Sequence, residues 1–182
     1  MRVQRKLRLR GGVLATTTVA VSVLTGCSLL PVEKSIDIDA EDVVRVEMFQ
    51  YTWGDESGAT RRVAIDPRGY GERSNGVERD SQVSMFTRMP TTVIDFDVAD
   101  AISGEEALGV RYHLADGTSK EITRVFLGYH DVVVFWPDGD VRHTEWGSPG
   151  LVDELCELDS EYEFLSCDEA TPSERPKVAL PS

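Results

Sequence analysis

The sequence predicts an α+β fold, with an antiparallel sheet of about five to seven strands and one or two short helices packed on it. Three observations indicate this class. Apolar and polar residues alternate in several short segments, which is the period of a half-buried strand. Two Asp-Gly turns separate such segments between residues 109 and 146. One apolar stripe with helical spacing follows them, and a helix of this kind packs on a sheet.

The first strand is expected from residue 43, where Val44, Val46 and Met48 alternate with polar residues. A weaker second strand is expected at residues 62–65. The glycine-rich residues 66–80 that follow are expected to form an exposed loop.

Residues 81–98 predict two further elements. Residues 81–89 fit either a helix or a strand. We favour a short helix that ends at Pro90, because proline lacks the amide hydrogen that would continue a helix. Residues 94–98 alternate apolar residues with Asp95 and Asp97, which predicts a strand with an acidic outer face.

Residues 109–146 predict a four-stranded antiparallel meander. Ala115-Asp116-Gly117 suits a three-residue hairpin loop with glycine in the left-handed position, and Pro137-Asp138-Gly139 is a second turn of this kind. The turns set a register whose pairs include Val110 with Ile122, Arg111 with Glu121, Phe135 with Val141 and Val133 with His143. Most residues then sort onto the faces by polarity, which supports the register.

Two elements complete the expected domain. The segment Val132–Trp136 is apolar at every position, so it is expected to be a central strand that is covered on both faces. Ser148 and Pro149 suit the start of a helix. The helix itself is predicted by one apolar stripe of Leu151, Val152, Leu155 and Leu158.

The first 27 residues carry the most specific pattern in the chain. Residues 2–10 contain five arginines or lysines and no acidic residue, and residues 13–24 contain no charge. This order is typical of a signal peptide. The uncharged run is shorter than the ~20 apolar residues that cross a bilayer. The residues that follow, Leu24-Thr25-Gly26-Cys27, resemble the lipobox of bacterial lipoproteins.

The resemblance to lipoproteins implies that residues 1–26 are a signal peptide and are removed. A diacylglycerol on the Cys27 sulfur would then hold the protein at the cell membrane, on its extracytoplasmic face. Ser28 would be compatible with sorting to an outer membrane in a cell that has two membranes. The strand and helix pattern of the domain also resembles small extracytoplasmic lipoproteins of undefined function.

The expected domain boundaries follow from composition. Residues 27–42 are predicted to be the lipidated cysteine and a flexible tether, which would span ~20 Å as a coil. Residues 43–167 are predicted to form a single α+β domain. Residues 168–182 contain three prolines and no large aromatic residue, which predicts a disordered C-terminal tail.

The charge of the chain narrows the classes of partner. The chain has 19 basic and 32 acidic residues, and loss of the signal peptide would leave a net charge of about −18. Such a surface repels phosphate backbones and anionic lipid headgroups, so we expect neither nucleic-acid binding nor an electrostatic membrane-binding face. A strongly acidic surface is typical of a solvated exterior or of a protein that binds a cationic partner.

Cys156 and Cys167 are the two cysteines that follow Cys27, and they lie eleven positions apart. In an oxidising compartment they are expected to form a disulfide. Two free or separately buried thiols are the alternative. A catalytic thiol is not expected, because the sequence has neither a Cys-x-x-Cys motif nor a histidine close by.

We assign no catalytic residue, metal site or cofactor from the sequence. His113, His130 and His143 lack the tight spacing of zinc ligands. Asp95, Asp97 and Asp100 would supply one face of a loose calcium site, and a solvated sheet edge is the alternative. The sequence contains no Gly-x-Ser-x-Gly elbow and no glycine-rich phosphate loop after a strand. An enzyme would need a pocket that gathers His143 or His130 with Asp131 and Glu145.

The candidate recognition surface consists of Trp136, Trp146 and Arg142, which share a face in the predicted register. Exposed and adjacent tryptophans would stack on a sugar ring or a peptide, whereas buried ones would belong to the core under the last helix. We therefore expect a lipid-anchored, non-catalytic module that binds or assists an envelope protein. A glycan, small-ligand or calcium-binding lipoprotein is the alternative, and an envelope hydrolase is a weaker one.

Overall fold

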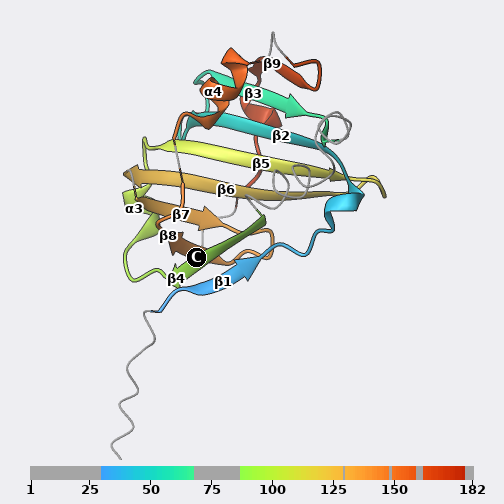
Figure 1. Ribbon diagram of the computed structural model, residues 1–182. Coiled ribbons are helices and arrows are strands. Elements are labelled where there is room, and N and C mark those ends of the chain that lie inside the picture. Colours follow the sequence, from blue (N-terminus) through green and yellow to red (C-terminus); the bar gives the residue numbers. More distant parts are fainter. Residues whose placement is uncertain (1–29, 68–86, 129, 148, 159–161, 179–182) are drawn as a thin grey trace, which may run out of the picture.

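A computed structural model of the protein describes residues 30–67, 87–128, 130–147, 149–158 and 162–178. Its strands form one antiparallel sheet in the order β1-β4-β8-β7-β6-β5-β2-β3-β9 (Figure 1). The predicted α+β class is confirmed. The nine strands exceed the expected five to seven, because residues 32–35 of the expected tether and residues 165–170, at the boundary of the expected tail, add a strand at each edge.

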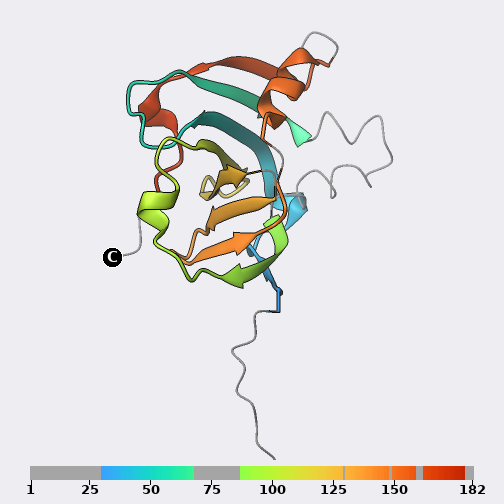
Figure 2. The same cartoon turned by 90° about the vertical axis from the view of Figure 1, so that its left-hand side faces the viewer.

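The strands are β1 (Val32–Ser35), β2 (Val43–Thr52), β3 (Thr60–Ile65), β4 (Arg88–Val93), β5 (Glu106–Leu114), β6 (Ser119–Gly128), β7 (Asp131–Phe135), β8 (Val141–Thr144) and β9 (Leu165–Ala170). Two α-helices, α3 (Val98–Ala101) and α4 (Leu151–Glu157), lie on opposite sides of the sheet (Figure 2). Two short 3-10 helices, η1 (Ala40–Asp42) and η3 (Pro172–Glu174), complete the described elements.

The predicted meander is confirmed as β5, β6, β7 and β8. Its pairs are those expected, including Val110 with Ile122 and Phe135 with Val141. Gly117 and Gly139 adopt φ angles of 84° and 82°, the left-handed conformation that each Asp-Gly turn requires. All residues of the segment Val132–Trp136 are buried, so this strand is central and covered on both faces, as expected.

Each face of the sheet carries its own apolar core. On one face, Val46, Val110 and Val134 pack with Val152 of α4. On the other face, side chains such as Val133 pack with Ile102, which directly follows α3. The predicted helix at residues 151–158 is therefore confirmed, although its N-cap is Gly150.

Residues 88–98 differ from the prediction. Residues 88–93 form strand β4, so the favoured helix is wrong there, while residues 81–86 lie outside the described part of the chain. Pro90 is tolerated because its partner β1 is a four-residue edge strand, and the Pro90 carbonyl accepts a hydrogen bond from Thr144 Oγ1 at 2.8 Å. The strand expected at residues 94–98 is also wrong. Asp97 instead caps α3, accepting a hydrogen bond from the Ala99 amide at 3.0 Å.

The expected tether at residues 27–42 is wrong from residue 32 onward. Strand β1 pairs with β4, and Ile36 is buried in the core at 8% exposure. Residues 36–38 carry two isoleucines whose burial offsets the entropy lost when this segment is ordered.

The expected disordered tail is also wrong for residues 168–178, which are part of the fold. Strand β9 pairs with β3 up to Ala170, and residues 171–178 then cross the sheet as a segment that we call the C-terminal strap. Arg175 holds the strap by donating hydrogen bonds to Thr60 Oγ1 at 2.6 Å and to the carbonyls of Asp55 and Gly58 at 2.6 and 2.7 Å. Its guanidinium also lies 4.6 Å from the centre of the Tyr51 ring.

Gly109 of β5 makes room for the strap. A Cβ atom at this position would lie 2.6 Å from Cγ of Pro176, whereas a Cβ at Gly128 of β6 would meet nothing within 4 Å. We expect Gly109→Ala to lower the free energy of unfolding by about 1–3 kcal/mol, because the strap must shift to avoid the clash. Urea unfolding measures the effect, with Gly128→Ala as the matched control. Equal stability of the two variants would contradict the close packing of the strap.

Candidate functional site

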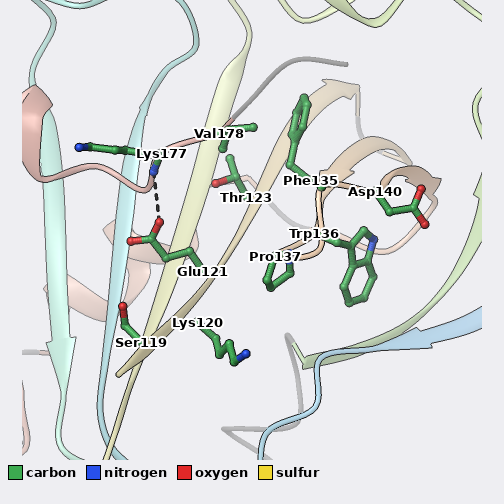
Figure 3. Close-up of a pocket in the computed structure, with 11 residues that line it drawn as sticks. Ser119, Lys120, Glu121, Thr123, Phe135, Trp136, Pro137, Asp140, Lys177 and Val178 are labelled. Atoms are coloured by element: carbon green, nitrogen blue, oxygen red, sulfur yellow. Dashed lines mark hydrogen bonds between the residues drawn. The ribbon is translucent and has the colours of Figure 1, made fainter. Parts of the chain in front are cut away.

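The structure contains a cavity of about 490 Å³ where β6, the β7–β8 turn and the C-terminal strap meet (Figure 3). Thr123 of β6 and Phe135 of β7 are paired across the sheet and form its floor. Pro137 and Val178 add apolar walls, and Glu121 adds a carboxylate. The volume lies in the range of ~300–1,000 Å³ that is usual for small-ligand pockets.

The C-terminal strap shapes this cavity through its backbone. The amide nitrogen of Lys177 donates a hydrogen bond to Oε2 of Glu121 at 3.2 Å, and the Lys177 side chain points away from the cavity (Figure 3). Besides the ring of Phe135 and the side chains of Pro137 and Val178, the cavity is lined by charged residues of both signs, namely Lys120, Glu121, Asp140 and Lys177. Such a surface suits a sugar ring or a short peptide better than a polyanion.

The turn beside the cavity is anchored to the first strand. Nζ of Lys34 donates hydrogen bonds to Asp138 at 2.8 Å and Asp140 at 2.7 Å, and it lies 5.4 Å from the centre of the Trp136 ring. Burial lowers the pKa of Lys34, but the two hydrogen bonds outweigh this effect and leave the pKa above its ordinary value. The hydrogen bond from Lys34 holds the pKa of Asp138 below its usual range.

The predicted recognition surface is not formed. Trp136 is 4% exposed and packs in the core with Val134, whereas Trp146 is 62% exposed. Arg142 donates a hydrogen bond from Nε to Asp140 at 2.8 Å. The expectation of two exposed, adjacent tryptophans is therefore wrong, and the alternative that Trp136 belongs to the core is confirmed. Trp136 still contributes to the wall of the cavity.

The structure brings His143 and Asp131 together, as the enzyme alternative required. Nε2 of His143 lies 2.7 Å from Oδ1 of Asp131, and Nδ1 lies 3.3 Å from Oγ1 of Thr92. This hydroxyl–imidazole–carboxylate line has the order of groups that activates a nucleophile. The other two residues that the enzyme alternative named for this pocket, His130 and Glu145, are exposed. Thr92 carried no signal in the sequence, because its place depends on the pairing of β4 with β8.

His113 belongs to a network around the buried carboxylate of Glu47. Glu47 is 6% exposed, and its oxygens lie 2.7 Å from Nε2 of His113, 2.9 Å from Arg45, 3.6 Å from Arg111 and 3.7 Å from Arg62. The predicted pair of Arg111 and Glu121 is confirmed at 2.6 Å. The sequence predicted an outer face for these residues, and it did not indicate that Glu47 would be buried among arginines that also bind Glu174 of the C-terminal strap.

The opposite face of the sheet buries another charged residue, Arg124, which is 4% exposed. Burial lowers its pKa to about 10. Its Nη2 atom lies 3.7 Å from the sulfur of Met89. Burial also raises the pKa of Tyr112, while the positive charge of Arg124 opposes this shift. No pattern in the sequence predicted that this arginine would be buried.

The remaining predicted sites have different outcomes. Cys156 and Cys167 form a disulfide that joins α4 to β9, with their Cα atoms 5.6 Å apart, so this prediction is confirmed. Within the described ranges, no group of three or more His, Cys, Asp or Glu side chains is arranged to hold a metal ion. The lipidation site Cys27 and the signal peptide lie outside the described residues. No helix in the described part of the chain is long and apolar enough to span a membrane.

No family model matches the sequence, and no curated protein or solved structure is significantly similar to it.

Removal of the disulfide is expected to destabilise the domain. The Cys156→Ala/Cys167→Ala variant should lose about 3 kcal/mol of unfolding free energy, because closure of this loop restricts the unfolded chain. Urea unfolding with and without a reductant measures the loss. The reductant should destabilise the wild type by the same amount and leave the double variant unchanged. A wild type that is insensitive to the reductant would contradict the prediction.

The Arg62–Asp168 pair should make stability depend on pH. The hydrogen bond and charge of Arg62 lower the pKa of Asp168, so its contribution is present above the unfolded pKa of about 4 and is lost as pH falls through the lower folded pKa. Asp168→Asn should therefore cost about 0.5–1 kcal/mol at neutral pH, since solvent screens this half-exposed pair, and less at about pH 2.

Urea unfolding at several pH values measures this dependence. Glu169→Gln, one position further along β9 and also exposed, is the matched control and should change little. A penalty for Asp168→Asn that does not shrink at low pH would show that the ion pair is not its source.

Proposed function

We propose that the protein is a lipid-anchored extracytoplasmic lipoprotein that acts as a non-catalytic binding or accessory module of the cell envelope. The observation that carries this proposal is the sequence Leu24-Thr25-Gly26-Cys27 behind a basic head and a short uncharged run. A diacylglycerol on Cys27 would hold the domain at the membrane surface.

The disulfide supports an extracytoplasmic location. Cys156 and Cys167 are bonded in the fold, and such bonds persist in oxidising compartments, while cytosolic thiols are usually kept reduced. A lipidated Cys27 would leave no free thiol in the mature chain, which has no other cysteine.

The cavity at the C-terminal strap supports a binding role. It presents Phe135, Pro137 and Val178 beside the carboxylate of Glu121, and it lies next to the turn that Lys34 anchors. The acidic exterior favours an encounter with a cationic protein surface. We therefore propose that an envelope protein contacts the domain around this cavity.

A lipoprotein that binds a sugar or another small ligand is the second candidate. The specific observation in its favour is the volume of the cavity, about 490 Å³, together with its aromatic floor. Both candidates use the same surface and differ in the size of the occupant, which an in-cell crosslinking experiment separates.

Substitution of the lipobox cysteine tests the anchor. Cys27→Ala should yield an uncleaved, unlipidated precursor, because the sulfur that accepts the lipid is missing. Globomycin-sensitive processing and the mass of the N-terminal peptide measure the change, and the wild-type protein is the reference. A Cys27→Ala protein that keeps both the lipid mass and the processing would contradict the lipoprotein proposal.

Filling the cavity tests the binding role. Ser119 is exposed at the mouth of the cavity, so Ser119→Trp should block it without disturbing the core. In-cell crosslinking of the full lipoprotein, followed by mass spectrometry, should give a dominant envelope protein that this variant loses. Ser166→Trp, on the exposed surface of β9, is the matched control. A partner retained by both variants would place the interface elsewhere, and a ligand of low mass would favour the second candidate.

A further inference from the structure

The edge of the sheet formed by β1 and β4 exposes three aliphatic side chains. Leu30 is 73% exposed, Val32 is 65% exposed and Val93 is 67% exposed. Val32 pairs with Thr91, two positions before Val93 on the same face of β4, so Val32 and Val93 are diagonal neighbours. Leu30 precedes Val32 by two positions. We call these three residues the β1–β4 apolar edge.

The chain leaves little distance between this edge and Cys27. Leu30 follows Cys27 by three positions and Val32 follows it by five. An extended chain spans at most ~3.6 Å per residue, so Leu30 lies within ~11 Å of Cys27 and Val32 within ~18 Å. Because β1 begins at Val32, only four residues separate it from an acylated Cys27.

The charge of the fold changes from one edge of the sheet to the other. Strands β1 and β4 contain Glu33, Lys34 and Arg88. Together with Asp138 and Asp140, which bind Lys34, and Arg142, which binds Asp140, they give this edge a net charge of zero. At the opposite edge, β9 and α4 contain five acidic residues and no basic residue, and the two arginines of β3 reduce this excess only to −3. An anionic membrane surface therefore repels the β9 edge and tolerates the β1 edge.

These edges lie at opposite ends of the strand stack. Figure 1 shows β1 and β4 at one end and β9 with α4 at the other. An anchor at the β1 end therefore places the disulfide-bonded end furthest from the attachment point.

We propose that the β1–β4 apolar edge inserts into the interfacial layer of the bilayer that holds the lipid on Cys27, and that β9 and α4 point away from the membrane. This inference rests on the proposed lipidation of Cys27. Apolar side chains gain free energy when they leave water for this layer, and the lipid holds them within reach of it. The two contacts together fix one orientation of the domain.

A fluorescent probe at each edge tests the orientation. The full lipoprotein carrying Val93→Cys or Leu158→Cys is labelled with the environment-sensitive dye NBD and reconstituted into vesicles of phosphatidylethanolamine and phosphatidylglycerol. Leu158 directly follows α4 and is 40% exposed, so it is the matched apolar control at the far edge. NBD emission at residue 93 should shift to the blue and be quenched by nitroxide-labelled acyl chains. Emission at residue 158 should remain that of an aqueous probe.

The mass of the peptide that contains Cys27, measured in the same preparation, distinguishes the orientation proposal from the lipoprotein proposal. An aqueous probe at residue 93 on a lipidated protein would overturn the orientation and leave the lipoprotein proposal intact. A blue shift without nitroxide quenching would also overturn it, because protein rather than lipid would then cover the edge. Absence of the lipid mass would overturn both.

A second variant tests whether the dye alone, rather than the apolar edge, draws residue 93 into the bilayer. Leu30→Ser/Val32→Ser should reduce nitroxide quenching at residue 93, and the exposure of both side chains means that the fold should be kept. Unchanged quenching in this variant would show that these two side chains do not take part in the insertion.

Discussion

The central strands of the sheet are apolar on both faces, and this constraint explains most of the architecture. Val132, Val133 and Val134 follow one another in β7 and are each 0% exposed. A strand of this kind is stable only when both faces of its sheet are covered. Helix α4 covers one face, and α3 and the C-terminal strap cover part of the other. Segments of polar composition at both ends of the chain are thereby drawn into the fold.

The C-terminal strap lies over strands that carry charged residues. These charged side chains therefore need hydrogen bonds and opposite charges as partners beneath the strap. Glu47 accepts contacts from three arginines and a histidine, and Arg111 in turn donates a hydrogen bond to the Glu174 carbonyl of the strap at 2.8 Å. A buried carboxylate is tolerated when hydrogen bonds and opposite charges surround it in this way. The same crossing of the strap creates the cavity beside Glu121.

The order of strands also arranges the proposed functions in space. Strand β1 begins five positions after the proposed lipidation site, and Lys34 of the same strand anchors the turn beside the cavity. Lys34 therefore links the cavity to the edge that is proposed to face the membrane, while the disulfide joins α4 to β9 at the opposite edge. A partner that reaches the cavity would meet the domain close to the membrane.

The sequence by itself determined the meander and its register, because Asp-Gly turns and alternating residues specify local pairing. It also predicted the disulfide, because Cys156 and Cys167 are the two cysteines that follow Cys27, but only the structure excluded two separate thiols. Only the tertiary structure decided the fate of polar segments such as residues 171–178, whose order depends on Gly109, Thr60 and other residues distant in the chain. Burial of Trp136, the position of Thr92 beside His143 and the cavity itself likewise depend on long-range pairing, which local patterns do not encode.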